Sequence, residues 1–280
     1  GNPVMRPYSS QPNNVKDFFQ TGVNAVNTVA IEGGNDIANV RFSYTNTQNQ
    51  GIMENTGLKR NNFNLRAFVK PAKFISVDSK ITYFLQEAYN RAEQGTQGIM
   101  SYLYDIPRNA AIDDYRNYQN PVNYAAVSHA TLGQNPFWTL YNDVLDDNRT
   151  RIQGFVKVNF EITDWFSLFV RTGVDQVSQS FERIDQYGHW YNPEGYFNYT
   201  TNSIRETNSD ILLMFKKPIN DDFNFSANLG ANAMHNTYTA QGVNGARFRI
   251  PTKPTTSSAD EVNPSYTPLR EKKIHSIYGS

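Results

Sequence analysis

The chain contains no cysteine, which excludes disulfide bridges and thiolate metal sites. It also lacks any apolar run near the ~18 residues that a membrane-spanning helix requires. A charge excess is missing too, because 26 basic residues balance 26 acidic ones. This balance argues against a nucleic-acid partner, since such a partner usually requires a basic surface. The negative mean hydropathy is typical of a soluble protein, but strands that alternate between lipid and lumen also average out as polar.

Tyrosine and phenylalanine are abundant, with 17 and 18 copies, in a chain of 280 residues. Aromatic residues favour pleated strands, and the frequent asparagines favour turns. The segment 151–162 shows the pattern most clearly, because apolar and polar residues alternate along it with a period of two. The apolar set is Ile152, Gly154, Val156, Val158, Phe160 and Ile162. The same alternation recurs along the chain and predicts a β protein.

The alternation predicts nine strands separated by turns and loops. The strands are expected near residues 22–32, 37–47, 61–70, 74–86, 151–162, 165–177, 209–217, 223–236 and 273–280. Short connections alternate with longer ones, of which 87–150, 178–208 and 237–272 are expected to be long loops. In an up-and-down sheet, successive connections leave from opposite ends. Tight turns at one end and long extracellular loops at the other are typical of outer-membrane barrels, as are strands of about ten residues.

Several motifs in the first third of the chain resemble a known family. They are Asp17-Phe18-Phe19-Gln20-Thr21-Gly22, Asn27-Thr28-Val29-Ala30-Ile31-Glu32-Gly33-Gly34, Val40-Arg41-Phe42-Ser43-Tyr44, Gly51-Ile52 and Leu58-Lys59-Arg60-Asn61-Asn62-Phe63-Asn64-Leu65. Their order and spacing over roughly residues 13–86 resemble the early barrel region of SusC/RagA-type TonB-dependent outer-membrane transporters.

The resemblance implies a plugged barrel of about 22 strands. It also implies an importer in the outer membrane of a Gram-negative bacterium, driven by the TonB complex and covered by a SusD-like surface lipoprotein. Its cargo would be an oligosaccharide or a peptide. A TonB box, a plug domain and a signal peptide are not found, so any TonB contact is expected through regions absent from this chain. We therefore expect a fragment of an all-β, antiparallel, up-and-down transmembrane β-barrel, with residues 1–21 as a lead-in segment and 22–280 as a partial barrel in contact with lipid.

Candidate sites for chemistry are few, and no cofactor or metal is expected. Gly33-Gly34-Asn35-Asp36 lacks the Lys-Ser/Thr ending of a phosphate-binding loop and suits a hairpin turn. The histidines His129, His189, His235 and His275 share no metal-ligand spacing.

A cluster of acids in the longest expected loop has three interpretations. Asp143, Asp146, Asp147 and Asn148 have oxygen ligands suited to calcium, but a solvated acidic turn is the favoured interpretation. A glycosidase pair would need two carboxylates at a defined separation, which nothing in the sequence fixes. We therefore expect no catalytic residue and no enzymatic activity.

An aromatic cluster in the second long loop is the candidate contact for cargo or for the lid lipoprotein. It consists of Tyr187, His189, Trp190, Tyr191, Tyr196, Phe197 and Tyr199. Flat amphipathic rings stack on sugars or anchor a protein partner. Alternatively, these rings pack the loop or belong to the aromatic girdle. Several charged residues are expected to face the lumen, and the simplest interpretation is that they meet the plug or water. They are Arg41, Arg66, Lys70, Lys80, Lys157, Glu161 and Arg171.

Two other classes of protein stay open at this point. A soluble extracellular β-sandwich or adhesin that binds glycan would have loops of mixed length at both ends of its sheet. A secreted carbohydrate-active enzyme would lose hydrolysis with the loss of one carboxylate.

Overall fold

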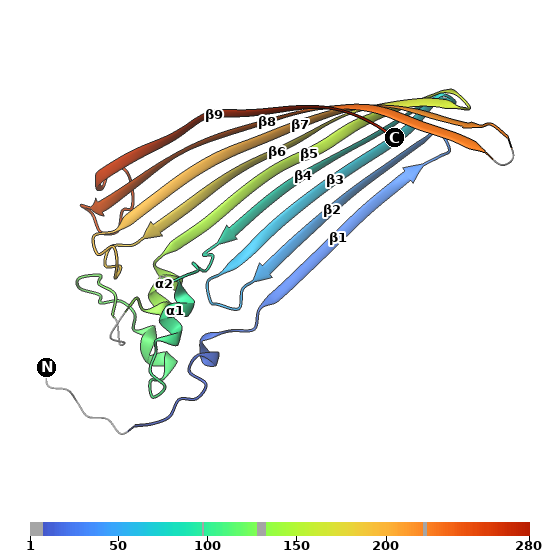
Figure 1. The fold of residues 1–280 in the computed structure, drawn as a ribbon. Coiled ribbons are helices and arrows are strands. Elements are labelled where there is room, and N and C mark those ends of the chain that lie inside the picture. The colour runs from blue at the N-terminus through green and yellow to red at the C-terminus, as the bar shows by residue number, and fades with distance from the viewer. Residues whose placement is uncertain (1–7, 97, 128–132, 221–222) are drawn as a thin grey trace.

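The computed structural model describes residues 8–96, 98–127, 133–220 and 223–280; residues 1–7 of the expected lead-in segment and His129 lie outside this part. Nine strands form one antiparallel sheet, in which each strand pairs with its neighbours in the chain (Figure 1). The strands are β1 (Val23–Gly34), β2 (Ala38–Gln50), β3 (Gly57–Ala72), β4 (Ile75–Tyr89), β5 (Val144–Thr163), β6 (Phe166–Asp185), β7 (Tyr196–Pro218), β8 (Asn224–Phe248) and β9 (Ala259–Gly279). The predicted all-β, up-and-down architecture is therefore confirmed.

Helical structure is confined to short segments near one end of the sheet. These are the 3-10 helices η1 (Lys16–Phe18) and η2 (Ile112–Arg116) and the α-helices α1 (Ile99–Tyr104) and α2 (Pro136–Tyr141). None of the helices in the described residues has the length and hydropathy needed to cross a membrane.

The two ends of the sheet differ, as the alternation of connections predicts. Tight turns lie at one end, for example 35–37, where the Asn35 side chain accepts hydrogen bonds from the backbone N–H groups of Ile37 and Ala38 at 2.9 Å. The other end carries the connections 51–56, 90–143, 186–195 and 249–258. Figure 1 shows the helices at this loop end and the C-terminus toward the turn end.

The strands β5 to β9 are longer than the sequence pattern predicts. β5 begins at Val144, β7 begins at Tyr196 and β9 begins at Ala259. The expected loops 178–208 and 237–272 are therefore wrong over most of their length, and 87–150 is too long at its end. The added residues are rich in serine, threonine, asparagine and glutamine on both faces, which removes the hydrophobic alternation while the backbone pairing continues.

Strand register assigns each side chain to one of two faces. Glu32, Arg41, Arg66 and Lys80 are directly paired neighbours across β1 to β4 and share what we term the polar face. The opposite, outer face carries the apolar sets predicted from alternation, including a directly paired row made by Val77, Val158, Val170, Ile211, Ala231 and Ile277. In a β-sandwich such a row would be covered by a second layer. Here Ile277 is 83% exposed, and the described residues form a single sheet.

The largest hydrophobic core lies outside the sheet, at its loop end. It joins three segments that are distant in sequence: Phe18 from η1, Met53 from the β2–β3 connection and residues from 99–140. The ring of Phe18 packs edge-on against that of Phe137, with centroids 5.3 Å apart. Burial of the Phe18 side chain therefore fixes η1 to the loop structure.

Replacing Phe18 by Ala should release this segment. Large buried aromatic residues contribute about 3–5 kcal/mol on truncation, so backbone amides of residues 8–22 and 99–106 should exchange faster with deuterium. Tyr8→Ala is the matched control, because Tyr8 is 74% exposed in the same segment. Equal exchange in the two variants would contradict this role of Phe18.

Candidate functional site

The polar face carries ion pairs that bridge neighbouring strands. Arg66 bonds Asp78 through two nitrogens, at 2.9 and 3.0 Å, between β3 and β4. Arg171 bonds Asp210 at 2.7 Å between β6 and β7. Further pairs join Glu32 to Arg41 and Arg151 to Asp175. The arginines of this face are thus largely neutralised by carboxylates within the sheet.

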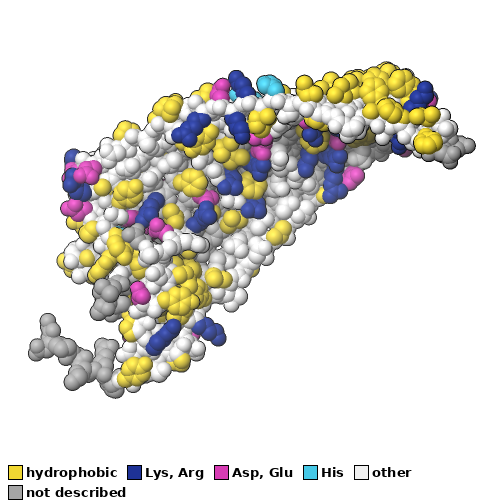
Figure 2. All heavy atoms as spheres, in the orientation of Figure 1, with side chains coloured by type: hydrophobic (Ala, Val, Ile, Leu, Met, Phe, Trp, Pro, Cys, Tyr) yellow, Lys and Arg dark blue, Asp and Glu magenta, His cyan; other side chains and the backbone are white. Residues whose placement is uncertain are grey.

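The middle of the polar face is hollowed between β4 and β7. A depression of about 300 Å³ is lined by residues that include Lys80, Gln153, Arg171, Asp175 and Glu206. Gly173 also contributes to its wall, and the lack of a side chain at this polar-face position deepens it. Figure 2 shows charged side chains of both signs gathered over the central part of the sheet. The predicted lumen-facing charges are therefore on one face, as expected.

The described residues of the segment 90–143, here termed the cap, form a folded unit between β4 and β5. Its core contains the buried side chains of Ile99, Leu103, Ile112, Phe137 and Leu140. Helix α2 begins at an Asn-Pro pair typical of helix starts, in which the Asn135 side chain accepts a hydrogen bond from the Phe137 backbone N–H at 2.9 Å. The same side chain donates to the carbonyl oxygens of Tyr115 and Val127. Asn135 therefore joins three parts of the cap.

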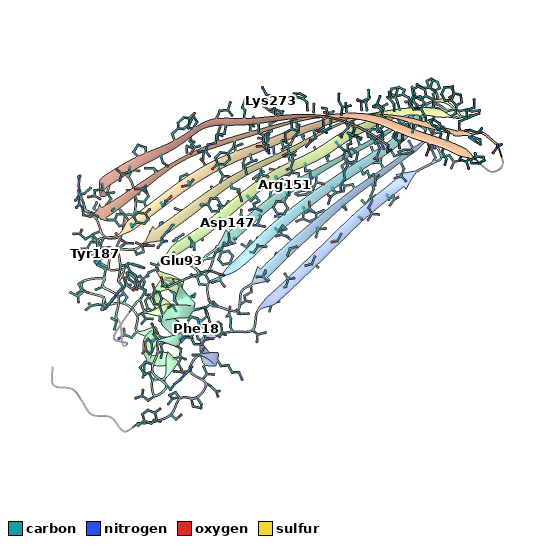
Figure 3. The ribbon with its side chains drawn as sticks, viewed as in Figure 1. Phe18, Glu93, Asp147, Arg151, Tyr187 and Lys273 are labelled. Carbon is teal, nitrogen blue, oxygen red and sulfur yellow. The ribbon has the colours of Figure 1, made fainter. Side chains whose placement is uncertain are left out.

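Ion pairs hold the cap on the polar side of the sheet. Arg91 bonds Asp147 of β5, and Glu93 bonds Arg183 of β6 at 2.9 Å. Both Asp147 and Arg183 project from the polar face, according to the strand register. The cap is therefore anchored over the polar face at the loop end and not over the outer face. Figure 3 shows Glu93 and Asp147 close to the junction between sheet and cap.

A second contact joins the cap to the β2–β3 connection. Arg116 bonds Glu54 through two nitrogens, at 2.8 and 3.1 Å, and Tyr141 donates a hydrogen bond to the same carboxylate. The Arg116 hydrogen bond lowers the pKa of the Glu54 carboxyl below its ordinary value of 4.5. The ionised form of Glu54 therefore favours the docked position of the cap.

The acids that the sequence places in a solvated turn lie instead in and beside β5. Asp146 and Asp147 are strand residues, and only 4% of the Asp147 side chain is exposed. Asp143 lies at the end of the cap, where burial raises its carboxyl pKa well above the ordinary value. The prediction of a solvated acidic turn is thus wrong. The cap brings buried partners to these acids from segments that are distant in sequence.

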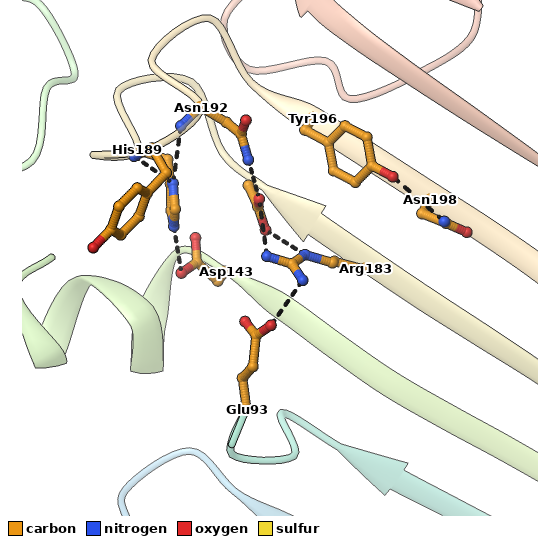
Figure 4. Close-up of polar contacts among 9 residues, drawn as sticks. Glu93, Asp143, Arg183, His189, Asn192, Tyr196 and Asn198 are labelled. Carbon is orange, nitrogen blue, oxygen red and sulfur yellow. Dashed lines mark hydrogen bonds and ion pairs between the residues drawn. The ribbon is translucent and has the colours of Figure 1, made fainter. Parts of the chain in front are cut away.

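Asp143, Asp185 and His189 form a compact polar cluster, with one ligand atom of each within 4.8 Å of the others. Figure 4 shows Asp143 and His189 facing each other. The tautomer of His189 decides what this cluster can bind. Its Nδ1 accepts hydrogen bonds from the backbone N–H groups of Tyr191 and Asn192, at 3.1 and 3.2 Å. The ring proton of neutral His189 therefore lies on Nε2, which is 3.6 Å from Asp143. A protonated Nε2 cannot ligate a metal ion.

Asp185 is likewise occupied by donors from the protein. It accepts hydrogen bonds from Arg183 at 3.0 and 3.3 Å and from the Asn192 side chain at 2.5 Å. Burial lowers the pKa of His189 and keeps the ring neutral at pH 7. This cluster of Asp143, Asp185 and His189, here termed the clasp, ties the β6–β7 connection to β6 through the hydrogen bond from Asn192 to Asp185. It also places His189 3.6 Å from Asp143 at the end of the cap.

The predicted aromatic cluster is divided by the structure. His189 is buried in the clasp, and Phe197 is buried against Phe248, with ring centroids 6.2 Å apart. Phe197, Phe248 and Ala259 form a second, smaller hydrophobic cluster, and Tyr187 packs against it. Tyr196 and Tyr199 lie on opposite faces of β7. The seven residues therefore do not form one surface.

Trp190 and Tyr191 are the two members of the cluster that stay exposed in the connection itself, each at 45%. The Trp190 backbone N–H donates to the Gln134 side chain at 3.2 Å. The ring of Tyr191 stacks on that of Tyr102 in the cap, with centroids 6.4 Å apart. Burial raises the pKa of the Tyr102 hydroxyl. Tyr102 was not predicted as a site residue, because no local pattern links it to a connection almost ninety residues later.

The Glu54–Arg116 contact predicts that docking of the cap depends on pH. Because the carboxyl pKa is lowered in the folded state, its stabilising contribution is complete above about pH 4.5 and is lost as the pH falls through the folded-state value. Deuterium exchange in residues 112–118, corrected for its intrinsic pH dependence, should rise below that point. In the Glu54→Gln variant, exchange should already be raised at pH 7 and should not rise further in acid. If the variant kept the same dependence on acid pH as the wild type, the result would count against the contact.

Comparison with known proteins shows similarity of fold. No family model matches the chain, and no curated protein matches it in sequence. The RagAB peptide importer in its closed-closed state matches with a TM-score of 0.72 and 12% identity, over 95% of this chain and 30% of that chain. Its open-open state matches with a TM-score of 0.69 and 11% identity, over 95% and 30%.

The unliganded ferric citrate transporter FecA has the same architecture. It matches with a TM-score of 0.58 and 11% identity, over 93% of this chain and 32% of that chain. The chain thus spans about a third of the length of these structures. Together with the single sheet, its two faces and its unequal ends, the similarity shows that this chain has the fold of a barrel-wall segment of TonB-dependent transporters such as the SusC/RagA-type RagAB.

Proposed function

We propose that this chain forms part of the wall and extracellular mouth of an active importer in the outer membrane of a Gram-negative bacterium. The observation that carries the proposal is the division of a single sheet into an exposed apolar face and a charge-paired polar face. In a barrel, such a sheet meets lipid on one side and water or a plug on the other. The loop end, with the cap, corresponds to the extracellular side.

The length of the strands supports a membrane position. About 9–11 tilted residues cross the hydrocarbon layer, whereas β7 has 23 residues and β8 has 25. The outer faces of these strands are apolar near the turn end and polar nearer the loop end. We infer that the apolar part spans the membrane and that the rest projects from its outer surface.

The remaining parts of the proposal extend to the whole transporter. In this proposal, residues 1–21 are a lead-in and residues 22–280 supply nine strands of a barrel of about 22. Further strands are needed because an open sheet would leave unpaired backbone edges in lipid. Energy would come from the TonB complex. A SusD-like lipoprotein would cover the mouth, and the cargo would be an oligosaccharide or a peptide. The similarity to the RagAB peptide importer supports peptide cargo and a transport role, not an enzymatic one.

Arginine substitutions on neighbouring residues test the orientation of the sheet. Val158 lies on the outer face, and Asn159 lies on the polar face with a hydrogen bond to Ser76 at 3.1 Å. Val158→Arg should destabilise the membrane-embedded transporter by about 2–4 kcal/mol, the typical cost of arginine at mid-bilayer. Asn159→Arg should have a much smaller effect in the same chemical unfolding experiment. Similar losses in both variants would refute the assignment of the outer face to lipid.

Trp190 and Tyr191 are our candidates for contact with cargo or with the lid lipoprotein, because they stay exposed beside the cap. Replacing both by Ala in the complete transporter should weaken cargo binding or lid binding about tenfold or more, as expected for aromatic anchors. Tyr199→Ala is the control, since Tyr199 is similarly exposed but faces outward on β7. Unchanged affinities for both cargo and lid would remove these residues from the proposed site.

A further inference from the structure

The outer face of β7 to β9 changes its chemistry in a fixed order from the turn end to the loop end. Near the turn end it is apolar, with Ile211, Ala231 and Ile277 in one directly paired row. Nearer the loop end follow positively charged and imidazole side chains, and beyond them a surface of hydroxyl and amide groups. Along the upper margin of Figure 2, hydrophobic side chains near the turn end are followed by histidine and by charged side chains.

The charged level consists of Arg205, His235, Lys273 and His275, here termed the basic band. His235 and Lys273 are directly paired across β8 and β9, and Figure 3 shows Lys273 at the edge of the sheet. Glu271 is the acidic neighbour, 3.4 Å from Lys273 and 3.6 Å from His235. The two fixed positive charges, on Arg205 and Lys273, therefore exceed the one negative charge.

Arg66, Arg151 and Arg171 on the polar face each bond a carboxylate on a neighbouring strand. Arg205 on the outer face makes no ion pair within the described part of the chain and is exposed. A guanidinium group offers five N–H donors in a planar fork that matches phosphate and carboxylate oxygens. We therefore expect an unpaired arginine that points outward from a membrane-facing surface to bind an anionic group outside the protein.

The basic band lies at the expected edge of the hydrocarbon layer. Arg205 is ten residues from Phe215 along β7, and His235 is ten residues from Phe225 along β8. At about 3.3 Å per residue and a tilt near 40°, ten residues span roughly 25 Å along the membrane normal, the height of the apolar band of such barrels. Phe215 and Phe225 thus fit one boundary of the membrane, and the basic band fits the other.

Beyond the basic band lies a hollow of about 570 Å³ that is free of charged groups. It is lined by Asn148, Thr150, Ser178, Gln179, Ser180, Thr201, Asn202, Ser203, Thr239, Ala240, Gln241 and Tyr266. Most of these residues have side chains on the outer face, including the directly paired Ser180, Thr201 and Gln241. Hydroxyl and amide groups both donate and accept hydrogen bonds, as sugar hydroxyls do. Tyr266 is 72% exposed at the rim and offers a ring for stacking.

We propose that the outer face of β5 to β9 binds a phosphorylated glycolipid of the surrounding membrane leaflet. The order of apolar surface, basic band and uncharged hydroxyl-rich hollow matches the acyl chains, phosphate and sugars of such a lipid. Arg205 and Lys273 bind the phosphate, and the hollow holds the sugars. The proposal rests on the proposed membrane position of the chain, but it assigns a lipid site that transport itself does not require.

Charge reversal in the complete transporter tests the basic band. The probe is bisphosphorylated lipid A, added to the purified transporter in detergent, with bound lipid measured by native mass spectrometry. The double variant Arg205→Glu/Lys273→Glu should bind the probe at least about tenfold more weakly, because two charge-assisted contacts are lost. Arg270→Glu is the matched control, since Arg270 lies on the same strand and is paired with Tyr238 on the polar face.

A second comparison tests the hollow. Ser203→Ile should leave the affinity for lipid A unchanged but weaken binding of lipid A that carries its core oligosaccharide, because the added side chain fills the sugar site. Arg205→Gln/Lys273→Gln should repeat the loss of lipid A binding without introducing negative charge. Folding of every variant is checked by circular dichroism and by heat-dependent gel mobility, so that a misfolded barrel is recognised.

The outcomes separate this proposal from the proposed function. Equal probe binding by wild type, the double variants and Arg270→Glu, in folded protein that still imports cargo, would overturn the lipid site and leave the importer intact. A disulfide cross-link between two copies of the Arg205→Cys variant would also overturn it, because the face would then be a contact between transporters. Failure of the wild-type protein to enter the outer membrane would instead overturn the proposed function.

Discussion

The continuous ladder of backbone hydrogen bonds is the constraint on which the rest of this structure depends. Each strand pairs with its neighbours over most of its length, from 12 residues in β1 to 25 in β8. In hydrocarbon, an unpaired N–H or C=O group costs several kcal/mol, so the membrane position proposed above requires pairing of this kind. Because successive side chains point to opposite faces, the same ladder separates apolar residues from charged ones. Fold and environment are thus specified together.

Charged side chains have different partners on the two faces of the sheet. On the polar face, Arg66 and Arg171 each bond a carboxylate on a neighbouring strand, which reduces the net charge of that face. At the loop end, Asp147 and Arg183 of the same face bind the cap instead. On the outer face, Arg205 has no such partner among the described residues. The charges inside therefore stabilise the wall and its cap, while the positive charge outside is directed at the surroundings.

The sequence predicts the sheet well where apolar and polar residues alternate, and poorly where they do not. Val40, Phe42 and Tyr44 alternate with polar residues, and β2 lies close to its expected position. Ser178, Thr201 and Gln241 occupy strand positions outside the membrane-sized apolar band. These residues face no apolar surface, so the periodicity of apolar and polar residues cannot distinguish such strands from loops. The cap escapes prediction for another reason. Its core packs against Phe18 of η1, which lies up to about 120 residues away in sequence, and no local pattern indicates that proximity.

The aromatic cluster shows why clustering in sequence does not ensure clustering in space. Tyr196 and Phe197 are adjacent, but the pleat sends them to opposite faces of β7. His189 accepts hydrogen bonds from two backbone N–H groups and faces Asp143. Its ring therefore stabilises the β6–β7 connection. What remains exposed at the mouth is Trp190 and Tyr191. The clasp fixes the backbone from which both project, and the stacking of Tyr191 on Tyr102 joins that pair to the cap. A rigid support of this kind reduces the conformational entropy that a partner would otherwise have to remove on binding.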